Sequence, residues 1–268
     1  MTGAAAPDAR STLPSVAAGA RLPELSYFFP AHNEEANVEG LVEEALTTLP
    51  ALADRFEIIV VNDGSRDATG EIADRLAAAS PDVVRAVHHP TNLGYGAALR
   101  SGFRASRYDA IGFTDGDRQF RIPDLGRLID RFSDPDRPDV VAGYRIRRAD
   151  PPIRTLYARA YRLANRIFFG VRVRDIDCAC KLFRRAALAG IRIESGGAFF
   201  SAELLIRLQA AGCRVVEVGV PHYARTAGSP TGAKPSVIWR AVKDFWALRL
   251  RLWSNRGRAM RRGTPILE

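Results

Sequence analysis

The chain has 268 residues, 47% of them hydrophobic and 26% charged, and a net charge of +9. This length and apolar content allow one large α/β domain with a buried core and argue against intrinsic disorder. No apolar run approaches the roughly 20 residues that span a bilayer. Three cysteines, an odd number, indicate reduced thiols in a cytosolic protein rather than a disulfide framework.

The charge is distributed unevenly along the chain. Residues 24–144 carry −9, residues 145–185 carry +9 and residues 234–262 carry +8. An acidic half followed by two basic segments indicates a substrate that brings negative charge, or an anionic membrane surface. Nucleic-acid binding is the alternative, although 36 of the 39 basic residues are Arg, a bias that GC-rich coding alone would also produce.

Residues 1–23 are predicted to form a disordered tail, because they are rich in Ala, Pro, Ser and Thr and lack the apolar core of a secretory signal. In residues 24–226, short β-rich runs alternate with helical periodicity, which predicts one α/β domain with a mostly parallel central sheet. The predicted strands are 25–29, 56–62, 83–88, 110–114, 140–143 and 215–220. The predicted helices are 35–49, 67–79, 97–105, 155–169 and 201–211.

Residues 227–268 are a basic C-terminal segment. Between residues 236 and 253, apolar side chains that include Trp253 alternate at helical spacing with basic ones such as Arg240 and Arg249. The pattern predicts an amphipathic helix that either lies on a membrane surface or docks on the protein's own core.

Two carboxylates, Asp115 and Asp117, directly follow the apolar run 110–113. Ligands of α/β sheets bind beyond the carboxyl ends of the strands, and two oxygen ligands there can share a hard cation that also binds substrate phosphates. A solvated turn is the simpler alternative, since Asp-Gly is common in turns.

Three further polar segments follow predicted strands. They are Asn33-Glu34, Asp63-Gly64-Ser65 and Gly94-Tyr95-Gly96. Each alone fits a helix cap or a tight turn, but together they would meet at one edge of the sheet, where a nucleotide would bind. Leu99 occupies the third glycine position of a dinucleotide fingerprint, which argues against that alternative.

These segments also carry a family resemblance. The chain resembles inverting, nucleotide-sugar-dependent glycosyltransferases of family 2, and within them the dolichol-phosphate mannose synthase-like proteins. The matching motifs are Pro30-x-x-Asn33-Glu34, Val61-Asn62-Asp63-Gly64-Ser65-x-Asp67-x-Thr69, Asn92-x-Gly94-Tyr95-Gly96, Thr114-Asp115-Gly116-Asp117-x-Gln119-Phe120 and Asp175-Ile176-Asp177-Cys178-x-x-Lys181-Leu182-Phe183-Arg184-Arg185.

The resemblance implies a GT-A (Rossmann-like) nucleotide-sugar-binding domain and a cytoplasmic enzyme, free or peripheral on the cytoplasmic face of the membrane. It implies that Mg²⁺ or Mn²⁺ is held by Asp115, Asp117 and Gln119, with Asp117 also catalytic. The residues implied to bind the donor nucleotide are Pro30, Asn33, Glu34, Asp63, Gly64, Ser65, Gly94 and Asp115.

For the acceptor, the resemblance implies a polyprenyl phosphate, whose anionic oxygen attacks the sugar directly. Arginine binds phosphate through bidentate hydrogen bonds. The implied phosphate ligands are Arg145, Arg154, Lys181, Arg184 and Arg225, and Arg145 and Arg154 are the implied catalytic pair that clamps the phosphate. A hydroxyl acceptor of a cell-envelope glycan or glycolipid is the alternative, and it would need a general base, for which Asp177 is the candidate.

Overall fold

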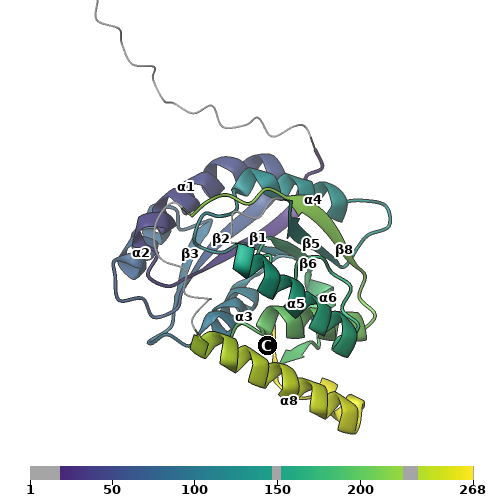
Figure 1. Cartoon of the computed structure of the whole chain (residues 1–268). Helices are drawn as coiled ribbons and strands as arrows, with labels where there is room; N and C mark the ends of the chain where they lie inside the picture. The colour runs from purple at the N-terminus through teal and green to yellow at the C-terminus, as the bar shows by residue number, and fades with distance from the viewer. Residues whose placement is uncertain (1–18, 147–151, 226–234, 268) are drawn as a thin grey trace, which may run out of the picture.

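The computed structural model describes residues 19–146, 152–225 and 235–267, with the backbone alone for residues 152–155, 235 and 255–259. Within them, seven strands form one sheet in the order β3-β2-β1-β4-β6-β5-β8, and helices cover both of its faces (Figure 1). A second sheet pairs β7 with β9.

The strands are β1 (Leu22–Ala31), β2 (Ala53–Asn62), β3 (Val84–His88), β4 (Ala110–Phe113), β5 (Val140–Arg145), β6 (Lys181–Arg184), β7 (Arg192–Ile193), β8 (Val215–Val220) and β9 (Thr264–Pro265). The helices are α1 (Glu35–Leu52), α2 (Thr69–Ala79), α3 (Tyr95–Ala105), α4 (Leu125–Phe132), α5 (Pro152–Phe169), α6 (Arg185–Leu188), α7 (Phe200–Ala210) and α8 (Pro235–Met260), with a short 3₁₀ helix at Ile122–Asp124.

The predicted mostly parallel sheet is confirmed, and all six predicted strands and all six predicted helices are present. Strand β6 was not predicted. It is only four residues long, and it begins with Lys181 and ends with Arg184, so its sequence does not have the continuous apolar run of a buried strand. It nevertheless lies in the middle of the sheet, antiparallel to both β4 and β5.

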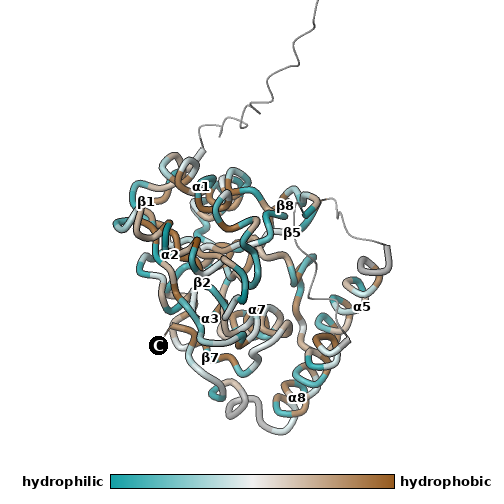
Figure 2. The backbone as a smooth tube through the Cα atoms, turned by 90° about the vertical axis from the view of Figure 1, so that its left-hand side faces the viewer, coloured by the Kyte–Doolittle hydropathy of each residue, from teal (hydrophilic) through white to brown (hydrophobic). Residues whose placement is uncertain are grey.

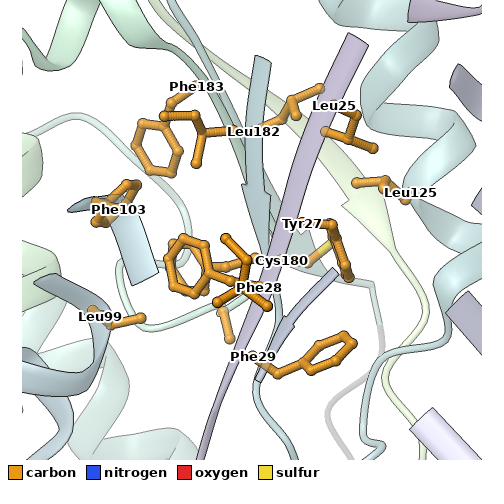
Figure 3. Packing of buried hydrophobic residues seen from close by; sticks show 14 of the residues in the cluster. Leu25, Tyr27, Phe28, Phe29, Leu99, Phe103, Leu125, Cys180, Leu182 and Phe183 are labelled. Atoms are coloured by element: carbon orange, nitrogen blue, oxygen red, sulfur yellow. The ribbon is translucent and has the colours of Figure 1, made fainter. Parts of the chain in front are cut away.

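Four phenylalanine rings pack together around β6, and Figure 3 labels three of them, Phe28, Phe103 and Phe183. Phe113 of β4 stacks on Phe28 of β1 at 5.2 Å and on Phe183 of β6 at 6.1 Å. Phe103 of α3 meets all three rings edge-on. All four side chains are buried, so each contributes its apolar area as well as favourable ring geometry.

The direction of β6 determines which segments meet at the sheet edge. Strands β1 to β4 are parallel, so the loops that follow them emerge together. Because β6 runs the other way, Lys181 pairs with Phe113, and the segment entering β6 lies beside the segment leaving β4. Residues 175–180 therefore arrive at the edge that carries Asp115 and Asp117.

The C-terminal part returns to the body of the domain. The inner side of α8 buries Phe245 and Leu248 against a second apolar cluster that includes Phe199 of the turn before α7. Strand β9 then pairs with β7. The predicted alternative that this helix docks on the protein's own core is thus confirmed for its inner side.

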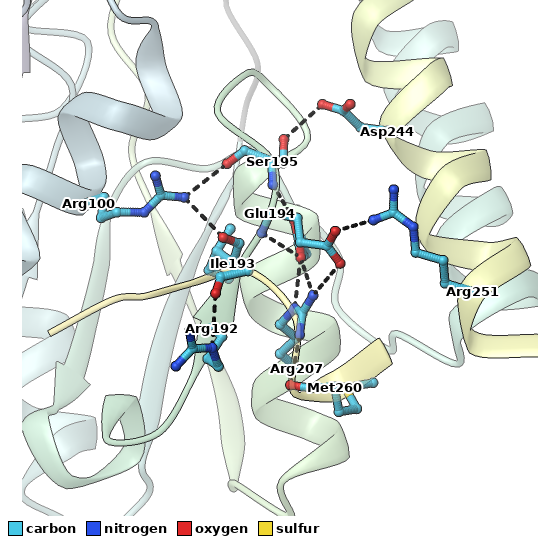
Figure 4. A network of polar contacts seen from close by, with 11 residues as sticks. Arg100, Arg192, Ile193, Glu194, Ser195, Arg207, Asp244, Arg251 and Met260 are labelled. Carbon is cyan, nitrogen blue, oxygen red and sulfur yellow. Dashed lines mark hydrogen bonds and ion pairs between the residues drawn. The ribbon is translucent and has the colours of Figure 1, made fainter. Parts of the chain in front are cut away.

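A buried ionic network fastens α8 to this region (Figure 4). The Arg207 guanidinium donates to Glu203 Oε1 at 2.7 Å, and both side chains are almost fully buried. Arg207 also contacts Glu194, which in turn accepts a hydrogen bond from Arg251 of α8. The Glu203 carboxylate is required here, since a buried guanidinium without an ionised partner carries a large desolvation cost.

We expect Glu203→Gln to lower the free energy of unfolding by about 3 kcal/mol, because it leaves the buried Arg207 charge without its main counter-ion. Denaturant titration followed by circular dichroism measures this. Glu39→Gln is the matched control, since Glu39 forms an exposed pair with Arg75, and its midpoint should match the parent. Equal midpoints for the two variants would contradict the assignment.

Candidate active site

Asp115 and Asp117 lie at the carboxyl end of β4, in a turn that packs against the end of β1. The Gly116 N–H donates to the Pro30 carbonyl at 3.3 Å. A Cβ on Gly116 would lie 2.9 Å from that oxygen, so only glycine fits this approach. Pro30 itself is buried in β1. The turn is therefore fixed by backbone contacts, which hold the two carboxylates next to each other.

The first carboxylate is oriented by a tyrosine. The Tyr95 hydroxyl, from the start of α3, donates to Asp115 Oδ1 at 2.9 Å. Burial, and then the neighbouring Asp117 charge, raises the pKa of Asp115 to about 7. The hydrogen bond from Tyr95 and the positive charges of Lys181 and Arg145 oppose that rise. Asp115 thus belongs to a site where extra positive charge would be stabilising.

The second carboxylate is bound by an arginine that also reaches the loop after β1. Arg225 donates to Asp117 Oδ2 at 2.7 Å and to Glu34 Oε1 at 3.2 Å. Glu34 also accepts from Asn37 Nδ2 at 2.6 Å. Burial raises the pKa of Glu34, and its hydrogen bond to Asn37 and the charge of Arg225 oppose this. Arg225, predicted as an acceptor ligand, thus lies between Glu34, a predicted donor-nucleotide residue, and Asp117, a predicted metal ligand.

Gln119 links the same turn to the segment before Arg225. Its side-chain amide donates to the Tyr223 carbonyl at 3.3 Å, and the Tyr223 N–H donates to the Gln119 carbonyl at 3.0 Å. The Gln119 N–H in turn donates to Asp117 Oδ1 at 3.0 Å. The backbone of Gln119 therefore orients Asp117, while its side-chain oxygen is the atom that could reach a cation.

Asp63 closes the turn that leads into α3. Its Oδ1 accepts from the Leu93 N–H at 2.8 Å and its Oδ2 from the Gly94 N–H at 2.9 Å. His89 Nδ1 contacts Oδ1 at 2.7 Å, and His89 Nε2 contacts Ser101 Oγ at 2.8 Å. A carboxylate has about four acceptor positions, so one remains for a ligand beside these three contacts.

Two glycines and one asparagine of the donor motifs adopt a positive φ, the backbone conformation that these residue types tolerate best. Gly64 has φ +62° and Gly94 has φ +98°. A Cβ on Gly64 would lie 2.2 Å from the Thr91 carbonyl carbon. Asn33, with φ 56°, receives the Arg66 N–H on its side chain and donates its own N–H to Ser65 Oγ at 3.0 Å. The loops after β1 and β2 are therefore locked together.

A cleft of about 470 Å³ lies between the end of β5, helix α5 and residues 174–177. Its lining residues are Tyr144, Arg145, Ala158, Arg159, Tyr161, Arg162, Arg174, Asp175, Ile176 and Asp177. Arg145, the predicted clamp, is held by Asp175 through two hydrogen bonds of 2.6 and 2.7 Å. Asp177 is exposed in this cleft, and its charge, after burial and Asp115, contributes to raising the pKa of Tyr95. Asp177 of the cleft is thus near enough for its charge to act on Tyr95, the residue whose hydroxyl binds Asp115.

The other predicted acceptor ligands are placed differently. The Lys181 ammonium is buried and donates to the carbonyls of Ile176 and Cys178, so it fixes the segment entering β6. Burial raises the pKa of the free Cys178 thiol to about 12, which keeps it protonated. The side chain of Arg154 lies outside the described residues, although its backbone belongs to α5.

Arg184 requires a correction. It pairs with Ala110 at the amino end of β4, the opposite edge from Asp115. Its guanidinium donates to the carbonyls of Pro138 and Phe132 and stacks 4.2 Å over the Phe132 ring. Because β6 is a strand, its last residue is carried to the far edge of the sheet, so Arg184 is removed from the acceptor site.

The donor atoms at this edge suit a hard divalent cation. Asp115 and Asp117 supply carboxylate oxygens and Gln119 an amide oxygen, which are the ligand types that Mg²⁺ and Mn²⁺ prefer. In the described part of the chain, no group of three or more His, Cys, Asp or Glu side chains is arranged to hold a metal. An ion here would therefore complete its coordination with substrate oxygens and water.

Three contributors to the site were not predicted from the sequence. Tyr95 lies in a recognised motif, but its hydroxyl contact to Asp115 depends on the docking of α3. His89 contacts Asp63 because it follows β3, beside β2 in the sheet. Asp175 was recognised as part of a motif, and its pairing with Arg145 follows from the direction of β6. For Tyr95 and Asp175, membership of a recognised motif was a signal in the sequence. His89 belongs to none of these motifs.

The domain is thus an α/β protein with a mostly parallel sheet and with polar loops and paired carboxylates at one edge, the edge at which proteins of this class bind their ligands. The sequence profile described as Glycosyl transferase family 2 matches residues 26–192. The chain belongs to this family, and it is therefore a glycosyltransferase.

Relatives of known sequence extend this finding. The chain is 37% identical to glycosyltransferase AglD of Haloferax volcanii over 97% of its own length and 42% of that protein. It is 30% identical to polyprenol monophosphomannose synthase of Mycolicibacterium smegmatis over 85% of this chain and 88% of the relative. With human dolichyl-phosphate beta-glucosyltransferase it shares 28% identity over 90% and 79%, respectively. The chain thus spans less than half the length of AglD but most of the other two.

Solved structures support the fold. Glucosyl-3-phosphoglycerate synthase from Mycobacterium tuberculosis, in complex with phosphoglyceric acid, superposes with a TM-score of 0.67 over 84% of this chain and 79% of that chain, at 21% identity. The likeness establishes a GT-A-like α/β fold. That enzyme has been solved with UDP and Mn²⁺ and with UDP and Mg²⁺.

We expect Asp63→Asn to lower the free energy of unfolding by about 2 kcal/mol, because an amide NH₂ would face one of the two backbone N–H groups of the turn at Leu93 and Gly94. Thermal or urea unfolding measures the loss. Asp74→Asn is the control, since Asp74 is exposed and its carboxylate contacts the partly exposed His88 ring, and its unfolding should be unchanged. A fully stable Asp63→Asn protein would contradict the turn-closing role.

Proposed function

We propose that this glycosyltransferase moves a hexose from a nucleoside diphosphate to a polyprenyl phosphate, with inversion at the sugar C1. The observation that carries the proposal is the position of the acidic pair. Asp117 shares Arg225 with Glu34 of the loop after β1, and the charge of Arg145, which lines the arginine-rich cleft, acts on Asp115. A donor diphosphate and an acceptor phosphate could thus meet at the same edge of the sheet.

On the donor side, Glu34, Asp63 and the turn at Gly94 would contact the nucleoside. Asp115, Asp117 and Gln119 would hold Mg²⁺ or Mn²⁺, which supplies positive charge to the leaving diphosphate. Tyr95 keeps Asp115 directed at that position, and Arg225 is close enough to Asp117 to contact the same diphosphate. These preset charges would stabilise the leaving group without reorganisation at the moment of reaction.

On the acceptor side, the phosphate oxygen would attack C1 as the bond from C1 to the diphosphate oxygen breaks. The nucleoside diphosphate leaves with the electron pair of that bond, and a single in-line displacement inverts the anomeric centre. A phosphate oxygen is already ionised, so no base is needed. Arg145, oriented by Asp175, and Arg154 on α5 would bind the phosphate, since guanidinium matches phosphate oxygens bidentately.

The relatives support this acceptor class. Both polyprenol monophosphomannose synthase and dolichyl-phosphate beta-glucosyltransferase are named for lipid phosphates, and the chain covers most of each. The second candidate is a hydroxyl acceptor with the same donor chemistry. The observation that favours it is the exposed Asp177 carboxylate in the cleft, which could take the hydroxyl proton.

The first test is a donor panel of GDP-mannose, UDP-glucose and UDP-N-acetylglucosamine, each with Mg²⁺ or Mn²⁺ and a short polyprenyl phosphate, scored for glycolipid. We expect product from one donor, loss of product in EDTA, and a loss of roughly a hundredfold or more in Asp117→Ala. Asp82→Ala is the control, because Asp82 is exposed ahead of β3, and it should remain active. Product formed equally well in EDTA would disprove the metal assignment.

Asp177→Asn distinguishes the two acceptors. With a lipid phosphate we expect glycolipid formation within about tenfold of the parent, because no proton must be removed. With a hydroxyl acceptor, loss of the general base would cost about 10²-fold to 10⁴-fold in turnover. Donor affinity, measured by calorimetry on the same protein, should stay unchanged in either case, and a large loss of turnover onto polyprenyl phosphate would overturn the first proposal.

A further inference from the structure

Helices α5 and α8 lie on the same side of the molecule (Figure 2) and meet where α5 ends. Phe168 and Phe169 of α5 pack against Phe245 and Trp246 of α8, with ring centroids 4.9 to 5.6 Å apart. Both helices also turn large apolar side chains to the outside. These are Leu156, Tyr157, Leu163 and Ile167 on α5 and Ile238, Trp239, Val242, Trp246, Leu250 and Trp253 on α8. We call these ten residues the α5–α8 face.

The exposure of this face is unusual for a water-facing surface. Trp253 is 79% exposed, Trp239 67% and Ile167 66%. Of the twelve large hydrophobic side chains that are exposed in the described part of the chain, ten belong to this face. Scattered single residues would need no explanation, but a concentration on two adjacent helices marks an interaction surface.

The spacing of the tryptophans gives the direction of the face. Trp239, Trp246 and Trp253 follow one another at intervals of seven residues, which is nearly two full turns. They form a stripe of about 21 Å along the helix axis. A partner that contacts the whole stripe must therefore lie parallel to α8 rather than at its end.

The charges around the face select the partner. The two helices together contain ten basic residues and a single acid, Asp244. That acid contacts Ser195 Oγ at 3.0 Å, on the inner side of α8. Arg159, Arg162, Arg166, Arg240 and Lys243 are exposed beside the apolar residues. A second copy of the chain would bring the same cations together, because a two-fold interface repeats one surface.

We propose that the α5–α8 face binds an anionic lipid bilayer, with both helices in the plane of the interface. Tryptophans prefer the interface between headgroups and acyl chains, and arginines beside them reach anionic headgroups. In the described residues no helix is long and apolar enough to cross a membrane, which suits a helix pair that lies on the surface. The surface is independent of the donor chemistry proposed above.

The chain supplies its own probe for this proposal. Its three tryptophans all belong to the α5–α8 face, so intrinsic tryptophan fluorescence reports on this surface alone. With vesicles of phosphatidylcholine and phosphatidylglycerol, we expect a blue shift, protection from aqueous acrylamide and quenching by brominated lipid. Binding should be weaker with phosphatidylcholine alone and should fall with added salt.

Variants separate the contributions of the two helices. Leu163→Ser combined with Ile167→Ser leaves every tryptophan in place and should weaken vesicle affinity about tenfold, because two apolar side chains no longer enter the bilayer. Arg166→Glu should weaken binding to anionic vesicles. Arg127→Glu, the same charge change at an exposed position of α4, should not. Circular dichroism of each variant checks that the fold is retained.

Two results would overturn the proposal. The first is a chain that stays in the supernatant with its tryptophans open to acrylamide when anionic vesicles are present. The second is a lipid-free, concentration-dependent dimer in light scattering whose tryptophans are already protected, which would make the face a contact between copies. Transfer to a water-soluble short-chain acceptor is measured in parallel, so a failure of membrane binding is distinguishable from a failure of the proposed reaction.

Discussion

The site depends on keeping two carboxylates of like charge together at the end of β4. Burial and repulsion between the two charges both disfavour the ionised carboxylates, and both raise the pKa of Asp115. The fold offsets the cost with directed partners: the Tyr95 hydroxyl on one carboxylate, Arg225 on the other, and the charges of Lys181 and Arg145 nearby. A divalent cation would stabilise such a concentration of negative charge further, because an opposite charge nearby favours the ionised carboxylates.

Strand β6 joins the acidic pair to the basic cleft. Its antiparallel direction returns the chain to the edge where β4 ends, and the buried Lys181 ammonium then fixes the segment that carries Asp175 and Asp177. Asp175 in turn orients Arg145. A parallel strand in the same place would deliver that segment to the opposite edge. The one reversal in the sheet therefore determines which charges share a site.

Much of the fold follows from the sequence, because parallel strands covered on both faces read as continuous apolar runs and their helices as amphipathic ones. The loops after β1, β2 and β4 could be placed at one edge for the same reason. What the sequence could not show were contacts that depend on strand order and direction. Arg184 was misplaced because β6 was not recognised, and the links from His89 to Asp63 and from Tyr95 to Asp115 need the packed sheet and α3.

Helix α5 connects the two inferences about this chain. Ala158, Arg159, Tyr161 and Arg162 line the cleft, whereas Leu156, Leu163 and Ile167 on the same helix face outward. A helix with its side chains is only about 10 to 12 Å across, so a bilayer on the outer side would lie within one helix diameter of the cleft. A lipid phosphate at the headgroup level could then reach the cleft while its apolar chain stays in the membrane. A soluble hydroxyl acceptor would gain nothing from this arrangement, so the position of α5 favours a lipid-borne phosphate.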